Sequence, residues 1–165
     1  MCAFRPAVSE YVPTDRHLRY IGAALAYLVA AVHLFHPERG FPRLVALVAT
    51  GNTGLLVSDP RPLLFVLSGV VILAAVKLVL LGLPRRPIYA GGMALVATYL
   101  VGYFAWHLSG HGGFLPGRRP NYHGLTPTEA VVSHLQAYPL VQAAVVVELA
   151  LLVVLAVLYR RESES

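Results

Sequence analysis

Hydrophobic residues gather along the chain in long runs that are separated by short polar corners. Three of these runs have about 20 residues, the length of α-helix that crosses the roughly 30 Å hydrocarbon core of a membrane. Because backbone N–H and C=O groups find no water there, an apolar run that enters the membrane must be helical. The pattern predicts an all-α integral membrane bundle of five transmembrane helices in a single domain, residues 1–165, with spans near 18–36, 41–58, 62–83, 87–109 and 139–160.

The second run, 41–58, is the weakest of the five. The sequence Thr50-Gly-Asn-Thr-Gly54 interrupts it, and each glycine in a helix interior costs about 1 kcal/mol relative to alanine. One interpretation is a short spanning helix whose small residues allow a neighbour to pack closely. The alternative is a broken or re-entrant segment that lines a cavity, which leaves four spans and places both termini on one side.

The segment 110–138 separates the last two spans. It begins with a Gly/Pro-rich loop, 110–126, and Thr126-Pro-Thr-Glu129 then has the pattern of a helix N-terminus with a capping box. A helix running unbroken from there to Tyr159 would be about 50 Å long, which exceeds the membrane core. Pro139 is the natural break, so we predict a short capped half-helix before the last span.

Composition favours a membrane protein over a soluble one. Of the 165 residues, 57% are hydrophobic and 13% are charged, whereas soluble domains carry about 25% charged residues. The net charge of +5 does not indicate nucleic-acid binding, because the arginines occur in pairs at the ends of apolar runs, where membrane proteins use them to orient helices. These pairs are Arg85-Arg86, Arg118-Arg119 and Arg160-Arg161.

The arginines at the ends of the predicted spans also indicate the orientation of the protein in the membrane. In the five-span arrangement, the compact arginine corners and the basic C-terminal tail favour an outside N-terminus and an inside C-terminus. The start of the chain lacks the pattern of a cleaved signal peptide, and Cys2, the only cysteine, permits no intrachain disulfide. Because arginine greatly outnumbers lysine in an Ala/Val/Leu/Gly-rich chain, we predict a multi-pass protein of a prokaryotic cell membrane.

Histidines are the main candidates for chemistry, and the chain has seven. His107 and His111 are four residues apart and share a face if the helix continues through both. His134 and His123 could add ligands, and neutral imidazole suits Zn, Cu, Fe or Ni, so the predicted metal ligands are His107, His111, His123 and His134. The glycines that follow His107 argue against this prediction, and the alternative is a set of interfacial histidines without a ligand.

Haem b is a more specific version of the same hypothesis. It needs one histidine from each of two helices at matching depth, and His107 with either His17 or His134 offers such a pair. His33 and His36 are three residues apart on one face, so we interpret them as helix-end residues near the negative end of a helix dipole.

Three polar residues, Asn52, Lys77 and Glu148, lie inside apolar runs. A charge at the centre of a span costs about 2.5–3.5 kcal/mol, so such residues usually face the bundle interior and pair with one another. Lys77 and Glu148 could form an ion pair between two helices, or Glu148 could serve in a proton relay with Asn52 and a histidine. The simpler alternative, which we favour, is one structural polar contact and a lysine that snorkels to the interface.

Motifs of hydrolytic enzymes are not found in the sequence, which has no phosphate-binding glycine loop, nucleophile elbow, H-E-x-x-H or paired catalytic carboxylates. We predict a small multi-pass membrane protein, a haem- or metal-associated accessory component of a membrane redox system, in contact with lipid and with other membrane subunits. One alternative is a small transporter or ion- or proton-conducting protein that uses Glu148 and Lys77. The other is a purely structural interaction subunit.

Overall fold

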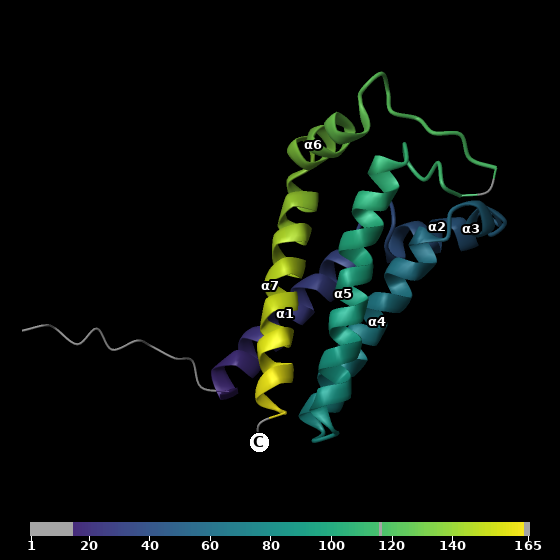
Figure 1. Cartoon of the computed structure of the whole chain (residues 1–165). Helices are drawn as coiled ribbons and strands as arrows, with labels where there is room; N and C mark the ends of the chain where they lie inside the picture. Colours follow the sequence, from purple (N-terminus) through teal and green to yellow (C-terminus); the bar gives the residue numbers. More distant parts are fainter. Residues whose placement is uncertain (1–14, 116, 164–165) are drawn as a thin grey trace, which may run out of the picture.

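The chain folds into a bundle in which four helices are long and apolar enough to cross a membrane. The computed structural model describes residues 15–115 and 117–163, and every regular element within these ranges is helical (Figure 1). The prediction of an all-α bundle with membrane character is therefore confirmed. The long helices are α1 (Asp15–Phe35), α4 (Arg61–Leu80), α5 (Arg85–Leu108) and α7 (Pro139–Arg161).

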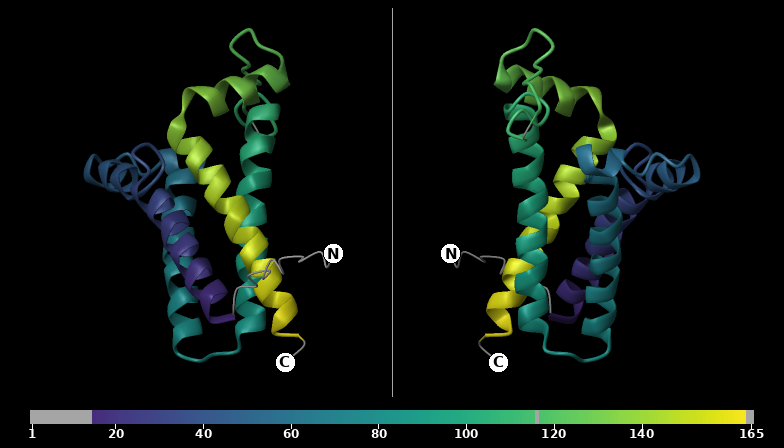
Figure 2. Two further views of the ribbon diagram at one scale, coloured as in Figure 1. Left: turned by 90° about the vertical axis from the view of Figure 1, so that its left-hand side faces the viewer. Right: turned by 90° about the vertical axis from the view of Figure 1, so that its right-hand side faces the viewer.

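The predicted span at 41–58 is not confirmed. This stretch forms two short helices, α2 (Phe41–Ala49) and α3 (Leu55–Ser58), which project from the flank of the bundle near the start of α4 (Figure 2). The break lies at Gly51, whose φ of +70° is a left-handed conformation that glycine adopts at no steric cost. Asn52 then donates to the Thr50 hydroxyl at 3.0 Å, so a polar turn replaces the middle of the expected helix.

Both described ends of the chain lie at the same end of the bundle. Arg161 at the end of α7 donates to the Asp15 carboxylate at the start of α1, at 2.8 Å, and Arg85 contacts Glu162 at 3.3 Å. This arrangement matches the four-span alternative and does not match the predicted five-span topology with opposite termini. Cys2 and the rest of the first 14 residues lie outside the described part of the chain.

The bundle is held together by contacts of α1 with α4 and α7, and of α7 with α5. Small and branched side chains from all four long helices meet at the centre, where they pack closely and bury apolar surface. The buried cluster consists of Ala26, Val29, Ala30, Ile72, Val96 and Leu151.

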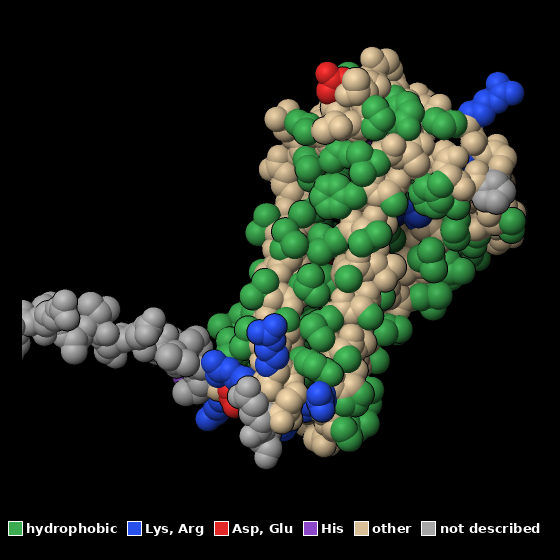
Figure 3. All heavy atoms as spheres, in the orientation of Figure 1, with side chains coloured by type: hydrophobic (Ala, Val, Ile, Leu, Met, Phe, Trp, Pro, Cys, Tyr) green, Lys and Arg blue, Asp and Glu red, His purple; other side chains and the backbone are tan. Residues whose placement is uncertain are grey.

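The outward faces of the long helices are apolar. Figure 3 shows hydrophobic side chains along the length of the bundle, with arginine side chains near its ends. Val71 of α4 is 56% exposed and Val153 of α7 is 63% exposed. Exposed aliphatic surface between charged ends suits contact with lipid chains.

The predicted half-helix is α6 (Pro127–Ala137), and it lies across one end of the bundle (Figure 1). Thr126 caps it, with the hydroxyl accepting from the Glu129 N–H at 3.3 Å and the Glu129 carboxylate accepting from the Thr126 N–H at 2.8 Å. Tyr138 is extended, with φ −123° and ψ 94°, as expected for a residue that precedes proline. The chain therefore turns between α6 and α7, and α6 packs against α5.

Candidate metal centre

Three of the predicted ligands converge at one end of the bundle, which we call the histidine-rich end: the last turn of α5, the loop 109–126, and α6. One ring nitrogen from each of His107, His111 and His134 lies within 4.8 Å of the others. The Nε2 atoms of His111 and His134 are 3.2 Å apart. The ring centroids of His107 and His134 are 4.6 Å apart.

His111 joins this group by a route that the sequence analysis did not predict. The helix α5 ends at Leu108, so His107 and His111 do not share a helical face. Gly110 and His111 both take left-handed conformations, with φ of +68° and +59°. For a histidine this conformation is uncommon and costs about 1–3 kcal/mol, so it must be held by the surrounding structure. It turns the chain back and carries the His111 ring over the end of α5.

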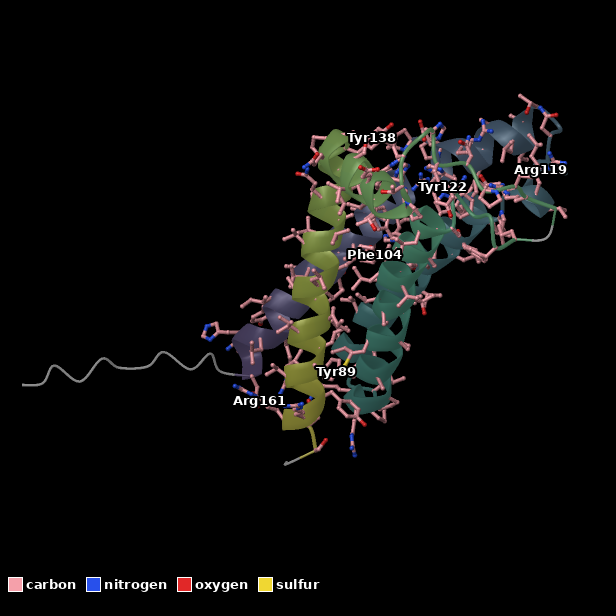
Figure 4. The ribbon with its side chains drawn as sticks, turned by 45° about the horizontal axis from the view of Figure 1, so that its top comes forward. Tyr89, Phe104, Arg119, Tyr122, Tyr138 and Arg161 are labelled. Atoms are coloured by element: carbon pink, nitrogen blue, oxygen red, sulfur yellow. The ribbon has the colours of Figure 1, made fainter. Side chains whose placement is uncertain are left out.

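Hydrogen bonds from the other side of the loop hold this turn. The Asn121 N–H donates to the Gly110 carbonyl at 2.9 Å, and the Asn121 carbonyl accepts from His111 Nδ1 at 2.7 Å. The Tyr122 hydroxyl donates to the Leu108 carbonyl at 3.1 Å, which satisfies an acceptor at the helix end. In Figure 4, Tyr122 lies near the top of α5 and Tyr138 near the junction of α6 and α7, whereas Arg161 marks the opposite end.

The hydrogen bonds of the three rings fix which nitrogen is available. Each Nδ1 lies 2.7–2.9 Å from a backbone carbonyl oxygen: Tyr103 for His107, Asn121 for His111 and Ala130 for His134. A carbonyl can only accept, so each Nδ1 carries the proton and each neutral ring presents a bare Nε2. Metal-binding histidines in proteins are oriented in this way, with the second nitrogen donating to a carbonyl or carboxylate.

The spacing of the three rings suits a small ion. Bonds of about 2.0–2.1 Å in tetrahedral geometry place two ligand nitrogens about 3.3 Å apart. The His111–His134 separation of 3.2 Å is already close to this value. The widest separation in the group, at most 4.8 Å, must shorten by about 1.5 Å to reach the same geometry, which is within the reach of small side-chain rotations.

The remaining predicted ligands lie outside this group. The His123 ring is 5.0 Å from the His111 ring, on the exposed side of the loop. His17 is in the first turn of α1, at the end of the bundle where α7 finishes (Figure 1). The structure therefore does not bring His17 together with His107 or His134.

The three polar residues that we placed inside apolar runs do not lie where an ion pair between Lys77 and Glu148 would need them. Asn52 lies in the turn between α2 and α3, and Lys77 is exposed near the end of α4. Glu148 is buried on α7 and contacts His33 of α1, with 3.7 Å between Oε1 and Nε2. From the sequence we predicted only that His33 lies at a helix end, because the nearness of a buried carboxylate depends on the packing of α1 against α7.

A cationic cluster borders the site on the side of α4. The guanidinium of Arg61 lies 4.0 Å from the centre of the Trp106 ring, and that of Arg118 lies 5.1 Å from it. Asp59 accepts two hydrogen bonds from the Arg61 guanidinium, at 2.7 and 2.6 Å, and one from the Arg61 backbone N–H at 3.3 Å. Burial alone would raise the pKa of the Asp59 carboxyl, but the hydrogen bonds and charge of Arg61, with Arg118 nearby, hold that pKa below its usual value.

Comparison with known proteins gives no match to a family model, to a curated protein or to a solved structure. Functional assignment therefore rests on the geometry and chemistry of the site itself.

Proposed function

We propose that this chain is an integral membrane protein that holds one transition-metal ion at its histidine-rich end. The ligands are the Nε2 atoms of His107, His111 and His134. One observation carries the proposal: three imidazoles from two helices and a loop each donate Nδ1–H to a carbonyl, and one ring nitrogen of each lies within 4.8 Å of the others. Without an ion, the contact of 3.2 Å between two such nitrogens brings two acceptors together.

A set of three neutral imidazoles favours Zn, Cu, Ni or Fe over Mg or Ca, which prefer oxygen. Three protein ligands also leave a coordination position open, the arrangement typical of zinc sites that act on a bound water or substrate. The His123 ring, next to His111, is the nearest further imidazole that could occupy that position. Such a site would suit a metal-associated component of a membrane redox or metal-handling system.

A bare ion fits these residues better than haem b. Two axial imidazoles of a haem place their Nε2 atoms about 4 Å apart, on opposite faces of the porphyrin. In such a pair, the ring centroids would lie further apart than the nitrogens, because each centroid is further from the iron. The centroids of His107 and His134 are only 4.6 Å apart. A third imidazole, His111, also occupies the same point, where the macrocycle would have to lie.

The experiment is metal loading of the purified, detergent-solubilised protein. We expect one Co²⁺ or Zn²⁺ per chain by elemental analysis after desalting, and visible Co²⁺ bands of a low-coordinate nitrogen site. Separate His107→Ala, His111→Ala and His134→Ala variants should each lose the bound ion. His17→Ala is the matched control and should retain it. A wild-type protein that binds no ion, or a triple variant that binds as well as wild type, would show that the three rings are not ligands.

A further inference from the structure

Glu148 and His33 form a second polar site, which lies inside the bundle and is separate from the metal ligands. Glu148 is 6% exposed and His33 is 3% exposed. Glu148 is nine residues into α7, so it lies about 14 Å from the start of that helix, well within the hydrocarbon thickness. An ionisable group at this depth usually marks a functional path or a specific pairing.

Hydrogen bonding fixes the form of the His33 ring. Its Nδ1 lies 2.8 Å from the Val29 carbonyl oxygen, so Nδ1 carries a proton and Nε2 faces Glu148 Oε1 at 3.7 Å. If His33 were neutral and Glu148 ionised, two acceptors would face each other and an uncompensated negative charge would be buried. One added proton, on either Oε1 or Nε2, makes the pair neutral overall. Because 3.7 Å is too long for a hydrogen bond, the pair offers two neighbouring places for a single proton, one on each residue.

Aromatic rings enclose the imidazole on its other sides. Tyr99 of α5 stacks on the His33 ring at 4.2 Å between centroids, with 28° between the planes, and Phe65 of α4 lies 4.7 Å away. Among the described residues, two further titratable side chains interact with the pair: Tyr99 on α5 with Glu148, and His36, just after α1, with His33. The two basic residues of α4 are Arg61, at its first position, and Lys77, which is exposed three turns beyond Phe65.

The two directions along the bundle differ at this site. Toward the end with Asp15 and Arg161, the next turn of every long helix contributes to the buried apolar cluster, which contains Val29, Ile72, Val96 and Leu151 among others. Toward the histidine-rich end, His36 directly follows the last residue of α1, is half-buried and accepts a hydrogen bond from the Glu38 N–H at 3.2 Å. Toward Asp15 and Arg161, the turn of α4 after Phe65 also holds the buried Ser68, whose hydroxyl donates to the Leu64 and Phe65 carbonyls. The titratable side chain that continues from the pair, His36, therefore lies toward the histidine-rich end.

We propose that Glu148 and His33 form a proton-binding dyad that exchanges one proton with the histidine-rich end and is closed to the opposite end by the apolar cluster. Proton uptake converts the carboxylate–imidazole pair into its neutral form, and release returns the pair to a net charge of −1. The His36 imidazole is the first group on the exchange route. The dyad stands independently of the metal site, because it shares no residue with it.

Infrared difference spectroscopy during a pH titration tests the dyad. We expect a pH-dependent carboxyl band that is lost in Glu148→Gln and shifted along the pH axis in His33→Gln. Glu129→Gln, which changes an exposed carboxylate of α6, is the control and should keep the band. Circular dichroism and Co²⁺ loading show whether each variant is folded, and nitrogen-15 spectra of the wild-type histidines give a readout that needs no substitution. A Glu148→Gln difference spectrum identical to that of wild type overturns the proposal.

One-sided access has its own test in liposomes that contain the protein in a single orientation. A pH jump on the side of the histidine-rich end should change the Glu148 band rapidly. The same jump on the other side should change it only as fast as protons leak across protein-free liposomes. A rapid response from both sides, or only from the side of Asp15 and Arg161, contradicts the proposed closure.

Discussion

His111 Nε2 and His134 Nε2 lie 3.2 Å apart, although one ring comes from a loop and the other from α6. Each ring donates its Nδ1–H to a backbone carbonyl, so the two facing nitrogens are acceptors unless one ring gains a second proton. This contact is unfavourable by itself and becomes favourable when a cation lies between the nitrogens. The relationship links metal binding directly to the stability of the histidine-rich end.

Metal binding should therefore raise the stability of the folded protein. An ion that binds only the folded state contributes about 2.7 kcal/mol at a free concentration 100 times its Kd. We expect Zn²⁺ to raise the Tm in detergent, and a chelator to reverse the change. The Tm of His134→Gln should not respond to Zn²⁺, whereas His17→Gln should respond as wild type does. An equal response of His134→Gln would place the ion elsewhere.

At Gly113 the loop lies close to the end of α5. A Cβ added there would collide with the Ser109 carbonyl oxygen and lie 2.8 Å from Pro120 Cγ. Gly113→Ala should destabilise the protein by about 1–3 kcal/mol, as overpacking does. It should also weaken Co²⁺ binding, because His111 lies in the same turn.

Gly102 provides the matched control within α5. A Cβ added there meets no atom within 4 Å, and alanine favours a helix over glycine by about 1 kcal/mol. Gly102→Ala should leave Co²⁺ binding unchanged and keep or raise the Tm, as measured by thermal unfolding followed by circular dichroism. A Gly113→Ala protein that matches Gly102→Ala in both measurements would mean that the loop can move away from α5 without affecting the site.

Much of this architecture follows from local patterns in the sequence. The apolar length of α4, α5 and α7 and the capping box at Thr126 are local signals, and the structure agrees with them. The histidine cluster was only partly predictable. The prediction placed His107 and His111 on one helical face, but Gly110 ends the helix and a left-handed turn returns His111 instead. The contact of His33 with Glu148 joins residues 115 positions apart and depends on how α1 packs on α7, which no spacing along the chain reveals.

The cap at Thr126 positions His134, the proposed metal ligand on α6. Thr126→Ala removes the hydroxyl that accepts from the Glu129 N–H, a change that typically costs about 1 kcal/mol. We expect fraying of the first turns of α6 and weaker Co²⁺ binding by His134, measured by titration of the visible bands. Thr128→Ala, at an exposed position in the same turn, should bind as wild type does. Equal affinities for the two variants would show that α6 is held by its packing on α5 alone.

Asp59 should stabilise the protein in a pH-dependent way. Its pKa in the folded state is below the usual value of 3.8, so its contribution is present above that value and is lost as the pH falls through the lower, folded-state pKa. Asp59→Asn should lower the stability by about 0.2–1 kcal/mol at neutral pH, as expected for a partly exposed ion pair. The difference in Tm from wild type should shrink as the solution is acidified below pH 3.8. A difference that grows in acid would contradict this sign.

The position of the 41–58 segment decides between four and five spans, and single cysteines can test it. In a Cys2→Ser background, Glu38→Cys lies before α2 and Ser58→Cys lies at the end of α3, both at exposed positions. Because α2 and α3 do not cross the bundle, an impermeant thiol reagent applied to one side of oriented vesicles should label both cysteines. Ser163→Cys, which follows α7, should be labelled only from the other side. If the segment spans the membrane, Glu38→Cys and Ser58→Cys must react from opposite sides, because a helix long enough to cross would separate them by about 30 Å.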